Sequence, residues 1–225
     1  MKYSLKYQLL AEGLRMSEHL MILNHPKDKN KVFLLADADY LDDVAYGQDV
    51  DFERMGRQYV RGMIQLSGRT EYPCEGALEV KRSAAEDGYG PTMYDIVMEL
   101  TDGIINDRDS VSKDAKRMMR RYKDGRPDVE KTLLDNVEDE ETYPRTPQEN
   151  DDCEPGDSHI YRAGSSVGYH NDTTWEEDPL SYAYNKTMSA RAQEMLRLGN
   201  ECIEKHKMEY WDIRKLASEF FKTRY

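Results

Sequence analysis

Apolar residues along this chain follow two patterns, short runs bounded by turn residues and longer stretches with helical spacing. The short runs predict strands at 32–36, 59–66, 77–84, 103–105, 129–134 and 180–185. Helical spacing predicts helices at 5–23, 91–100, 112–122, 189–206 and 210–222. No internal repeat interrupts this succession of elements.

A glycine turn, Gly88-Tyr89-Gly90, joins the strand at 77–84 to the helix at 91–100. Glycine lets the backbone turn without a clash at Cβ, and proline suits the first helical position because no amide donor is lost there. Pro91 therefore predicts where this helix begins. The free amides of the first helical turn favour an anion, so the turn predicts binding of a phosphate of a nucleotide-type ligand.

The charge of the chain is concentrated in one segment. The net charge is −12, and residues 135–178 contain fourteen acidic and two basic residues, so the other thirty acids and thirty bases cancel. This segment has two interpretations. It is either a solvated insertion or a loop whose negative electrostatic field attracts a cationic amine. The whole chain has no basic footprint of the kind that binds nucleic acid.

Other features of the sequence bear on the cellular compartment. No apolar stretch approaches the about 20 residues that a membrane span requires. The three cysteines, Cys74, Cys153 and Cys202, form no CxxC pair. An odd count without such a pair argues against a disulfide framework and predicts a reducing cytoplasm.

The order of elements resembles that of the GNAT superfamily of acyl-CoA-dependent N-acyltransferases, with the central match between 77 and 122. Gly88 and Gly90 match the two small positions of the pyrophosphate loop of that superfamily, and Ala85 stands where an Arg or Gln is usual. Ser112 and Ala115 match the start of its next helix. The stretch from 88 to 115 is also similar to GNAT-like proteins carried by tailed bacteriophages.

The predicted helix at 112–122 departs from the superfamily at one position. Met119 stands where the superfamily has a tyrosine, and Tyr122 follows three residues later. Methionine cannot donate a proton, so Tyr122 is a second-choice candidate for the acid; without it, the thiolate would leave unaided or toward another group.

The resemblance implies an α/β fold of the α+β type, with a mixed, mainly antiparallel central sheet flanked by helices. It divides the chain into an N-terminal helix at 1–31, a GNAT-like body at 32–186 that includes the acidic insertion 135–178, and a C-terminal helical tail at 187–225. The tail could pack on the body or on a second subunit, which makes a homo-oligomer possible.

The resemblance also implies an activity, transfer of an acyl group, most simply acetyl, from acetyl-CoA to an amine without a metal. The acceptor would be a small molecule or a protein lysine, and neither nucleic acid nor membrane is an expected partner. Glu79 would be the general base, and Tyr122 a candidate acid. The cofactor would be bound by Val80, Arg82, Ala85, Gly88, Tyr89, Gly90 and Thr92. The expected location is the cytoplasm, or the host cytoplasm or virion for a viral protein.

Several alternatives remain open or are set aside. The departures at Ala85 and Met119 favour a binding or structural protein that has lost turnover, and the acidic segment would suit an interaction protein. The sequence 164–168 matches GxSxG, but turn-like residues follow it where a hydrolase needs a helix. Cys153, His159 and His170 fit no familiar zinc spacing.

Overall fold

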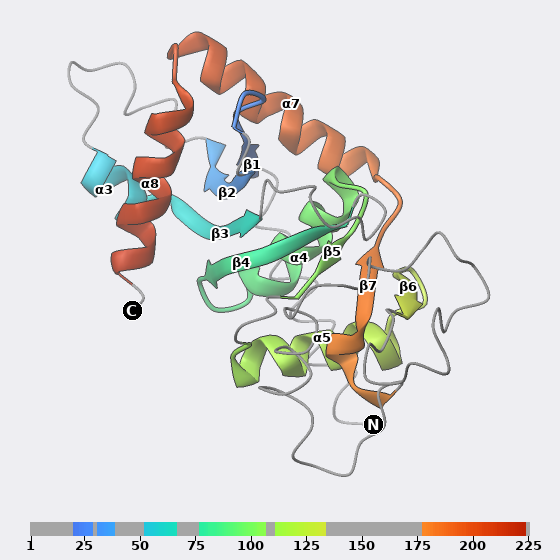
Figure 1. Ribbon diagram of the computed structural model, residues 1–225. Helices are drawn as coiled ribbons and strands as arrows, with labels where there is room; N and C mark the ends of the chain where they lie inside the picture. The colour runs from blue at the N-terminus through green and yellow to red at the C-terminus, as the bar shows by residue number, and fades with distance from the viewer. Residues whose placement is uncertain are drawn as a thin grey trace.

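A computed structural model describes residues 20–28, 31–38, 52–66, 77–106, 111–133 and 177–223 (Figure 1). The strands are β1 (Leu20–Leu23), β2 (Val32–Asp37), β3 (Val60–Leu66), β4 (Leu78–Ala85), β5 (Ile104–Ile105), β6 (Glu130–Leu133) and β7 (Tyr182–Asn185). The helices are α3 (Phe52–Gln58), α4 (Tyr89–Leu100), α5 (Lys113–Gly125), α7 (Ala190–Lys205) and α8 (Tyr210–Lys222), with a short 3₁₀ turn at Pro179–Ser181. No described helix is long and apolar enough to cross a membrane.

The strands form one mixed, mainly antiparallel sheet in the order β1-β2-β3-β4-β5-β7-β6. Every neighbouring pair is antiparallel except β4 and β5, which run parallel. This confirms the predicted α+β class and the mainly antiparallel character of the sheet. The sheet therefore has two antiparallel parts that meet at one short parallel contact.

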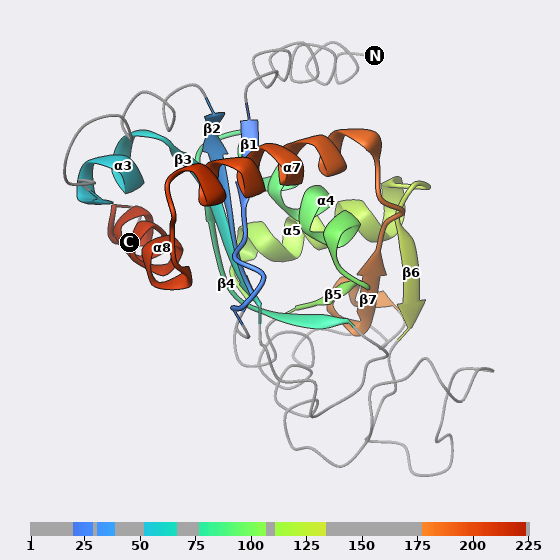
Figure 2. The same cartoon turned by 90° about the horizontal axis from the view of Figure 1, so that it is seen from above.

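Both faces of β1 to β4 carry helices, and β1 and β2, which are buried almost throughout, are almost wholly apolar. Figure 2 shows α4 and α5 on one face of these strands and α3 and α8 on the other. In β2, Phe33 and Leu35 pack into the core beneath α4, whereas Val32 and Leu34 pack into the core beneath α8. Alternate residues of one strand thus supply two separate cores.

The prediction of a helix at 5–23 is wrong for its last four residues, because Leu20–Leu23 forms the edge strand β1. All four residues are buried, and a run that is apolar on both faces cannot be told from a helix by its periodicity. Residues 1–19 lie outside the described part of the chain. The helix α3 was not predicted at all.

The prediction for the start of α4 needs a second correction. The helix begins at Tyr89, with Gly88 as its N-cap, so Pro91 occupies the third helical position rather than the first. Ser112, by contrast, lies at the start of α5 as predicted, and as its N-cap it accepts a hydrogen bond at Oγ from the Ala115 amide at 3.2 Å. The other predicted strands and the two C-terminal helices appear within a few residues of their expected bounds.

Candidate functional site

The parallel strands β4 and β5 separate soon after they meet. They pair only at Leu78 with Ile104 and at Glu79 with Ile105. Among the described strands, only β3 pairs with β4 beyond that point, so the other edge of residues 80–85 is open. An unpaired strand edge presents backbone donors and acceptors that an extended ligand can use.

A groove follows this open edge and consists of two continuous parts. The inner groove, of about 240 Å³, is lined by Val80, Lys81, Arg82, Asn106, Val111 and Phe221. The outer groove, of about 510 Å³, is lined chiefly by Ala85, Gly88, Gly90, Pro91, Arg117 and Arg121. Both parts share Ser83, Tyr94, Ser112 and Ala115. Together they have the size of a pocket for a small organic ligand.

Two hydroxyls lie where the inner and outer grooves join. The Tyr94 hydroxyl of α4 donates to Ser83 Oγ of β4 at 2.9 Å. Tyr94 is otherwise buried in the core, so this bond fixes its hydroxyl at the groove wall. Sequence analysis did not select either residue, since their pairing depends on how α4 packs on the sheet.

The glycine turn has the backbone that only glycine adopts readily. Gly88 has φ +89°, in the left-handed region. The Tyr89 amide donates to the Glu86 carbonyl at 3.0 Å, and Pro91 has no amide hydrogen. Of the first three helical residues, only Gly90 therefore keeps an amide for a ligand. Fewer amides are therefore available to an anion than the sequence predicted, because Pro91 lies at the third helical position.

Charges of both signs surround the outer groove. Glu86 pairs with Arg61 at 3.0 Å, and Asp114 pairs with Arg117 at 3.2 Å. Asp87 and Arg121 also line the outer groove, and neither forms an ion pair with another described residue. A phosphate here would be attracted by Arg121 and repelled by Asp87.

The predicted site residues do not all meet in this groove. Val80 and Arg82 line the inner groove, and Ala85, Gly88 and Gly90 line the outer groove. Tyr89 packs against the core, and neither Tyr89 nor Thr92 is among the lining residues.

The two predicted catalytic residues lie in different surroundings. Glu79 Oε2 lies 2.6 Å from Nζ of Lys81, which lines the inner groove. The Tyr122 side chain is fully buried, and its hydroxyl donates to the Pro91 carbonyl at 3.0 Å. Burial is the main cause that raises the pKa of Tyr122 well above its usual value. Tyr122 is thus a core residue whose hydroxyl does not line the groove.

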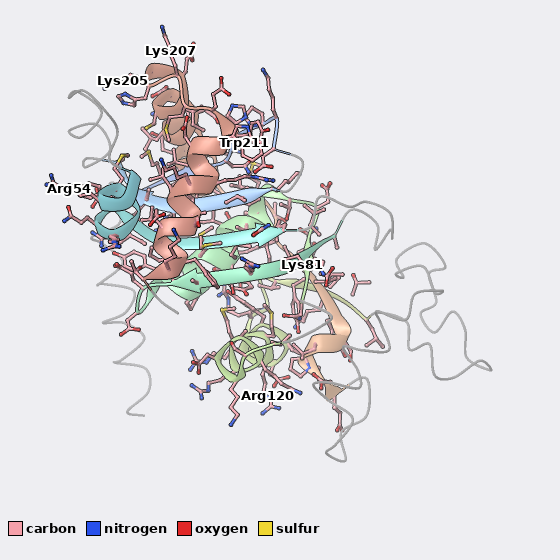
Figure 3. All side chains as sticks on the ribbon, turned by 60° about the vertical axis from the view of Figure 1, so that its left-hand side comes forward. Arg54, Lys81, Arg120, Lys205, Lys207 and Trp211 are labelled. Atoms are coloured by element: carbon pink, nitrogen blue, oxygen red, sulfur yellow. The ribbon has the colours of Figure 1, made fainter. Side chains whose placement is uncertain are left out.

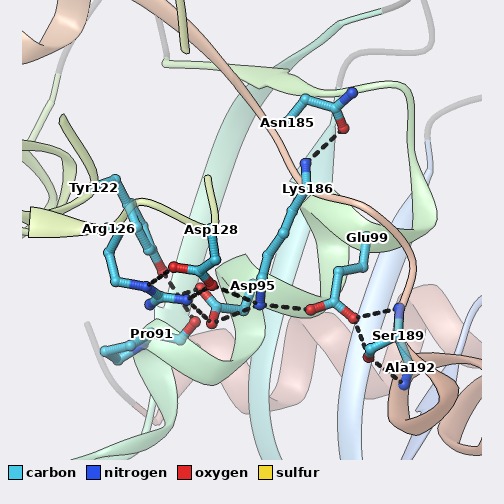
Figure 4. A network of polar contacts seen from close by, with 10 residues as sticks. All are labelled: Pro91, Asp95, Glu99, Tyr122, Arg126, Asp128, Asn185, Lys186, Ser189 and Ala192. Atoms are coloured by element: carbon cyan, nitrogen blue, oxygen red, sulfur yellow. Dashed lines mark hydrogen bonds and ion pairs between the residues drawn. The ribbon is translucent and has the colours of Figure 1, made fainter. Parts of the chain in front are cut away.

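A polar network anchors the far end of α4 (Figure 4). Lys186 Nζ contacts Glu99 at 2.7 Å and Asp95 at 3.3 Å, and Asp95 also contacts Arg126 at 2.8 Å. The Ser189 amide donates to Glu99 at 3.2 Å, and the Ser189 hydroxyl donates to the same carboxylate. The network therefore joins α4 to the residue that caps α7 and to the end of α5.

Glu99 is held in its charged form within this network. Its burial alone would raise its pKa, but the hydrogen bonds and charge of Lys186 and the hydrogen bonds of Ser189 outweigh burial, so the net pKa is lowered. A carboxyl whose folded pKa is lowered stabilises the fold above its unfolded pKa. That contribution is lost as the pH falls through the folded pKa.

We expect Glu99→Gln to lower the free energy of unfolding at pH 7 by about 2 kcal/mol, because charge-assisted hydrogen bonds of this size are lost. Urea unfolding at pH 7 and at successively lower pH measures the effect. The deficit should shrink as the pH falls through the lowered folded pKa of Glu99, where the wild-type carboxylate becomes protonated. Glu194→Gln, in an exposed pair with Arg197 on α7, is the control and should change little. A pH-independent deficit would contradict the assignment.

Three features from the sequence fall outside the described residues. These are the acidic segment apart from its last two residues, the GxSxG sequence at 164–168, and the Cys153, His159 and His170 set. At the described end of the acidic segment, Asp178 pairs with Lys116 of α5 at 2.8 Å. Within the described ranges no group of three His, Cys, Asp or Glu side chains is arranged for a metal.

Comparison of the chain with family models, with curated proteins and with solved structures found no match.

Proposed function

We propose that this protein binds acyl-CoA in the groove and transfers the acyl group, most simply acetyl, to an amine. The observation that carries the proposal is the separation of β4 from β5 after two residue pairs, which opens the groove along β4. The order of the strands and this separation are compatible with the GNAT fold that the sequence resembles.

The two parts of the groove fit the two parts of such a ligand. The outer groove has the Gly90 amide and the Arg121 guanidinium, which suit a phosphate. The open edge of β4 from Val80 to Ala85 extends for about 17 Å at the usual strand rise, and it suits the amides of an extended pantetheine arm. The thioester would then reach the inner groove, near the point where β4 and β5 separate.

The proposed reaction needs a base to take the amine proton, and it can proceed without an acid from the protein, because solvent can protonate the thiolate. The amine nitrogen attacks the thioester carbonyl carbon, a carbon–nitrogen bond forms, and the carbon–sulfur bond breaks with its electron pair left on sulfur. We assign Glu79 as the base that takes the amine proton, because it contacts Lys81 at the inner groove. The thiolate takes up a proton from solvent, since Tyr122 is buried elsewhere.

A second candidate function is acyl-CoA binding without turnover. The placement of Tyr122 and Met119 favours it, because both are buried in the core and neither presents a proton donor to the groove. This candidate shares the ligand with the first and differs only in the transfer step.

Release of free thiol from acetyl-CoA distinguishes these candidates. The amines offered as acceptors are spermidine, a lysine-bearing peptide and an amino acid with a neutral side chain. We expect amine-dependent thiol release, with the cationic acceptors favoured by the acidic segment. Binding of acetyl-CoA without amine-dependent release would leave the non-catalytic candidate and refute the transferase.

Two neighbouring arginines of α5 test the outer groove. Arg121 lines it, whereas Arg120 points outward from α5, away from the sheet (Figure 3). We expect Arg121→Ala to weaken CoA binding about fivefold, as the loss of one exposed charge contact implies, and Arg120→Ala to change it little. Asp87→Asn should strengthen binding. Titration calorimetry at low and high salt measures all three, and equal effects of the two arginines would contradict the placement.

A further inference from the structure

Asn106 follows β5 and is almost fully buried, with 4% of its surface exposed. Its Nδ2 makes no hydrogen bond with any described residue. Buried amide groups are nearly always paired, because an unpaired donor loses its bonds to water without replacement. A buried donor that no described residue satisfies is available to an acceptor on a ligand.

The inner groove is where such a partner could lie. Asn106 lines it together with Val80, Val111 and Phe221. Those three neighbours are apolar. Two charged side chains also line the inner groove, but Lys81 pairs with Glu79 and Arg82 lies over the Phe221 ring. Asn106 is an uncharged donor beside the apolar side chains, so it suits a neutral carbonyl oxygen better than a phosphate.

We propose that Asn106 Nδ2 donates a hydrogen bond to the thioester carbonyl oxygen of the acyl-CoA. This inference rests on the proposed function. It adds a hydrogen-bond donor for the thioester carbonyl, a role that is assigned neither to the glycine turn nor to Glu79. When the amine attacks, the carbonyl oxygen gains negative charge, and a donor already in place stabilises that charge. The charge returns to the carbon–oxygen double bond as the thiolate leaves.

The stability of the free protein gives the first test. Leucine is close to asparagine in size and shape and has no polar atoms, so Asn106→Leu should leave the melting temperature unchanged or higher. The control is Asn185→Leu, because Asn185 Oδ1 already accepts from the Lys186 amide at 2.7 Å. Asn185→Leu should lower the melting temperature. A clear drop for Asn106→Leu would show that Asn106 is satisfied within the fold, and it would overturn the proposal.

Ligand discrimination gives the second test. S-ethyl-CoA is a thioether that lacks the carbonyl oxygen of acetyl-CoA. We expect the wild-type protein to bind acetyl-CoA about tenfold more tightly than S-ethyl-CoA, as one hydrogen bond allows. Asn106→Leu should bind the two with equal affinity, and Asn185→Leu should keep the tenfold ratio. Titration calorimetry measures each affinity.

The outcomes separate this inference from the proposed function. If the wild-type protein binds both CoA compounds equally, or if Asn106→Leu keeps the discrimination, the role of Asn106 is wrong while acyl-CoA binding stands. An equal loss of affinity for both compounds in Asn106→Leu would likewise overturn the assignment to the thioester carbonyl. If no CoA compound binds, the proposed function fails and this inference fails with it.

Discussion

Gly199→Ala is expected to lower the free energy of unfolding by about 3–5 kcal/mol, or to prevent folding, because it overpacks a backbone contact. Gly199 lies on α7, which runs along the free edge of β1 (Figure 1). A Cβ built on Gly199 would lie 1.8 Å from the carbonyl oxygen of Ile22. The obstacle is backbone, so no rotation of a side chain can relieve it.

The relief of this overlap would move α7 away from the sheet. Both cores would be affected, because Ala192 and Met195 pack beneath α4, while Cys202 and Ile203 pack beneath α8. The midpoint of thermal unfolding should fall by about 10 °C, at about 2–4 °C per kcal/mol for a chain of this size.

Gly125→Ala is the matched control for Gly199→Ala. Gly125 is also helical, and nothing lies within 4 Å of its built Cβ. Its φ is not positive, so alanine should be neutral or slightly stabilising. A Gly199→Ala protein that melts with the wild type would contradict the close contact between α7 and β1.

The second large effect concerns catalysis. Glu79→Gln should reduce the rate of amine-dependent thiol release by about a hundredfold or more, because glutamine cannot accept the amine proton. The affinity for acetyl-CoA should stay the same, since Glu79 is assigned to proton transfer alone. Single-turnover thiol release at saturating acetyl-CoA measures the transfer step without interference from binding.

Glu130→Gln is the control for this experiment. Glu130 also lies on a strand, β6, but its side chain is exposed and β5 and β7 separate this strand from β4 in the sheet. Its rate should match that of the wild type. If Glu79→Gln keeps the wild-type rate, or loses rate only through weaker binding of acetyl-CoA, the assignment of Glu79 as the base is wrong.

Local sequence patterns predicted the part of the fold that lies next to the groove. The strand before the glycine turn, the helix after it and the Ser112 cap each depend on a few neighbouring residues, and all three are present. The edge strand β1 was missed because its apolar residues face two cores, a fact that only the packing of α7 and α8 determines.

Side-chain roles were harder to predict than the elements that carry them. Tyr122 was selected because it follows Met119 by about one helical turn, but the helix turns it toward the Pro91 carbonyl and the core. Asn106 could not be selected, because an unpaired buried amide is visible only when its surroundings are known. The network around Lys186 likewise joins residues that are distant in sequence.

Titration of the wild-type protein with acetyl-CoA tests the central claim, that the groove along β4 binds acyl-CoA. Calorimetry should give one site per chain, and a concentration of a hundred times Kd should raise the stability by about 2.7 kcal/mol. Ala115→Phe, which places a ring where the inner and outer grooves join, should abolish both effects. No heat and no rise in melting temperature at millimolar acetyl-CoA, or unchanged binding by Ala115→Phe, would contradict the claim.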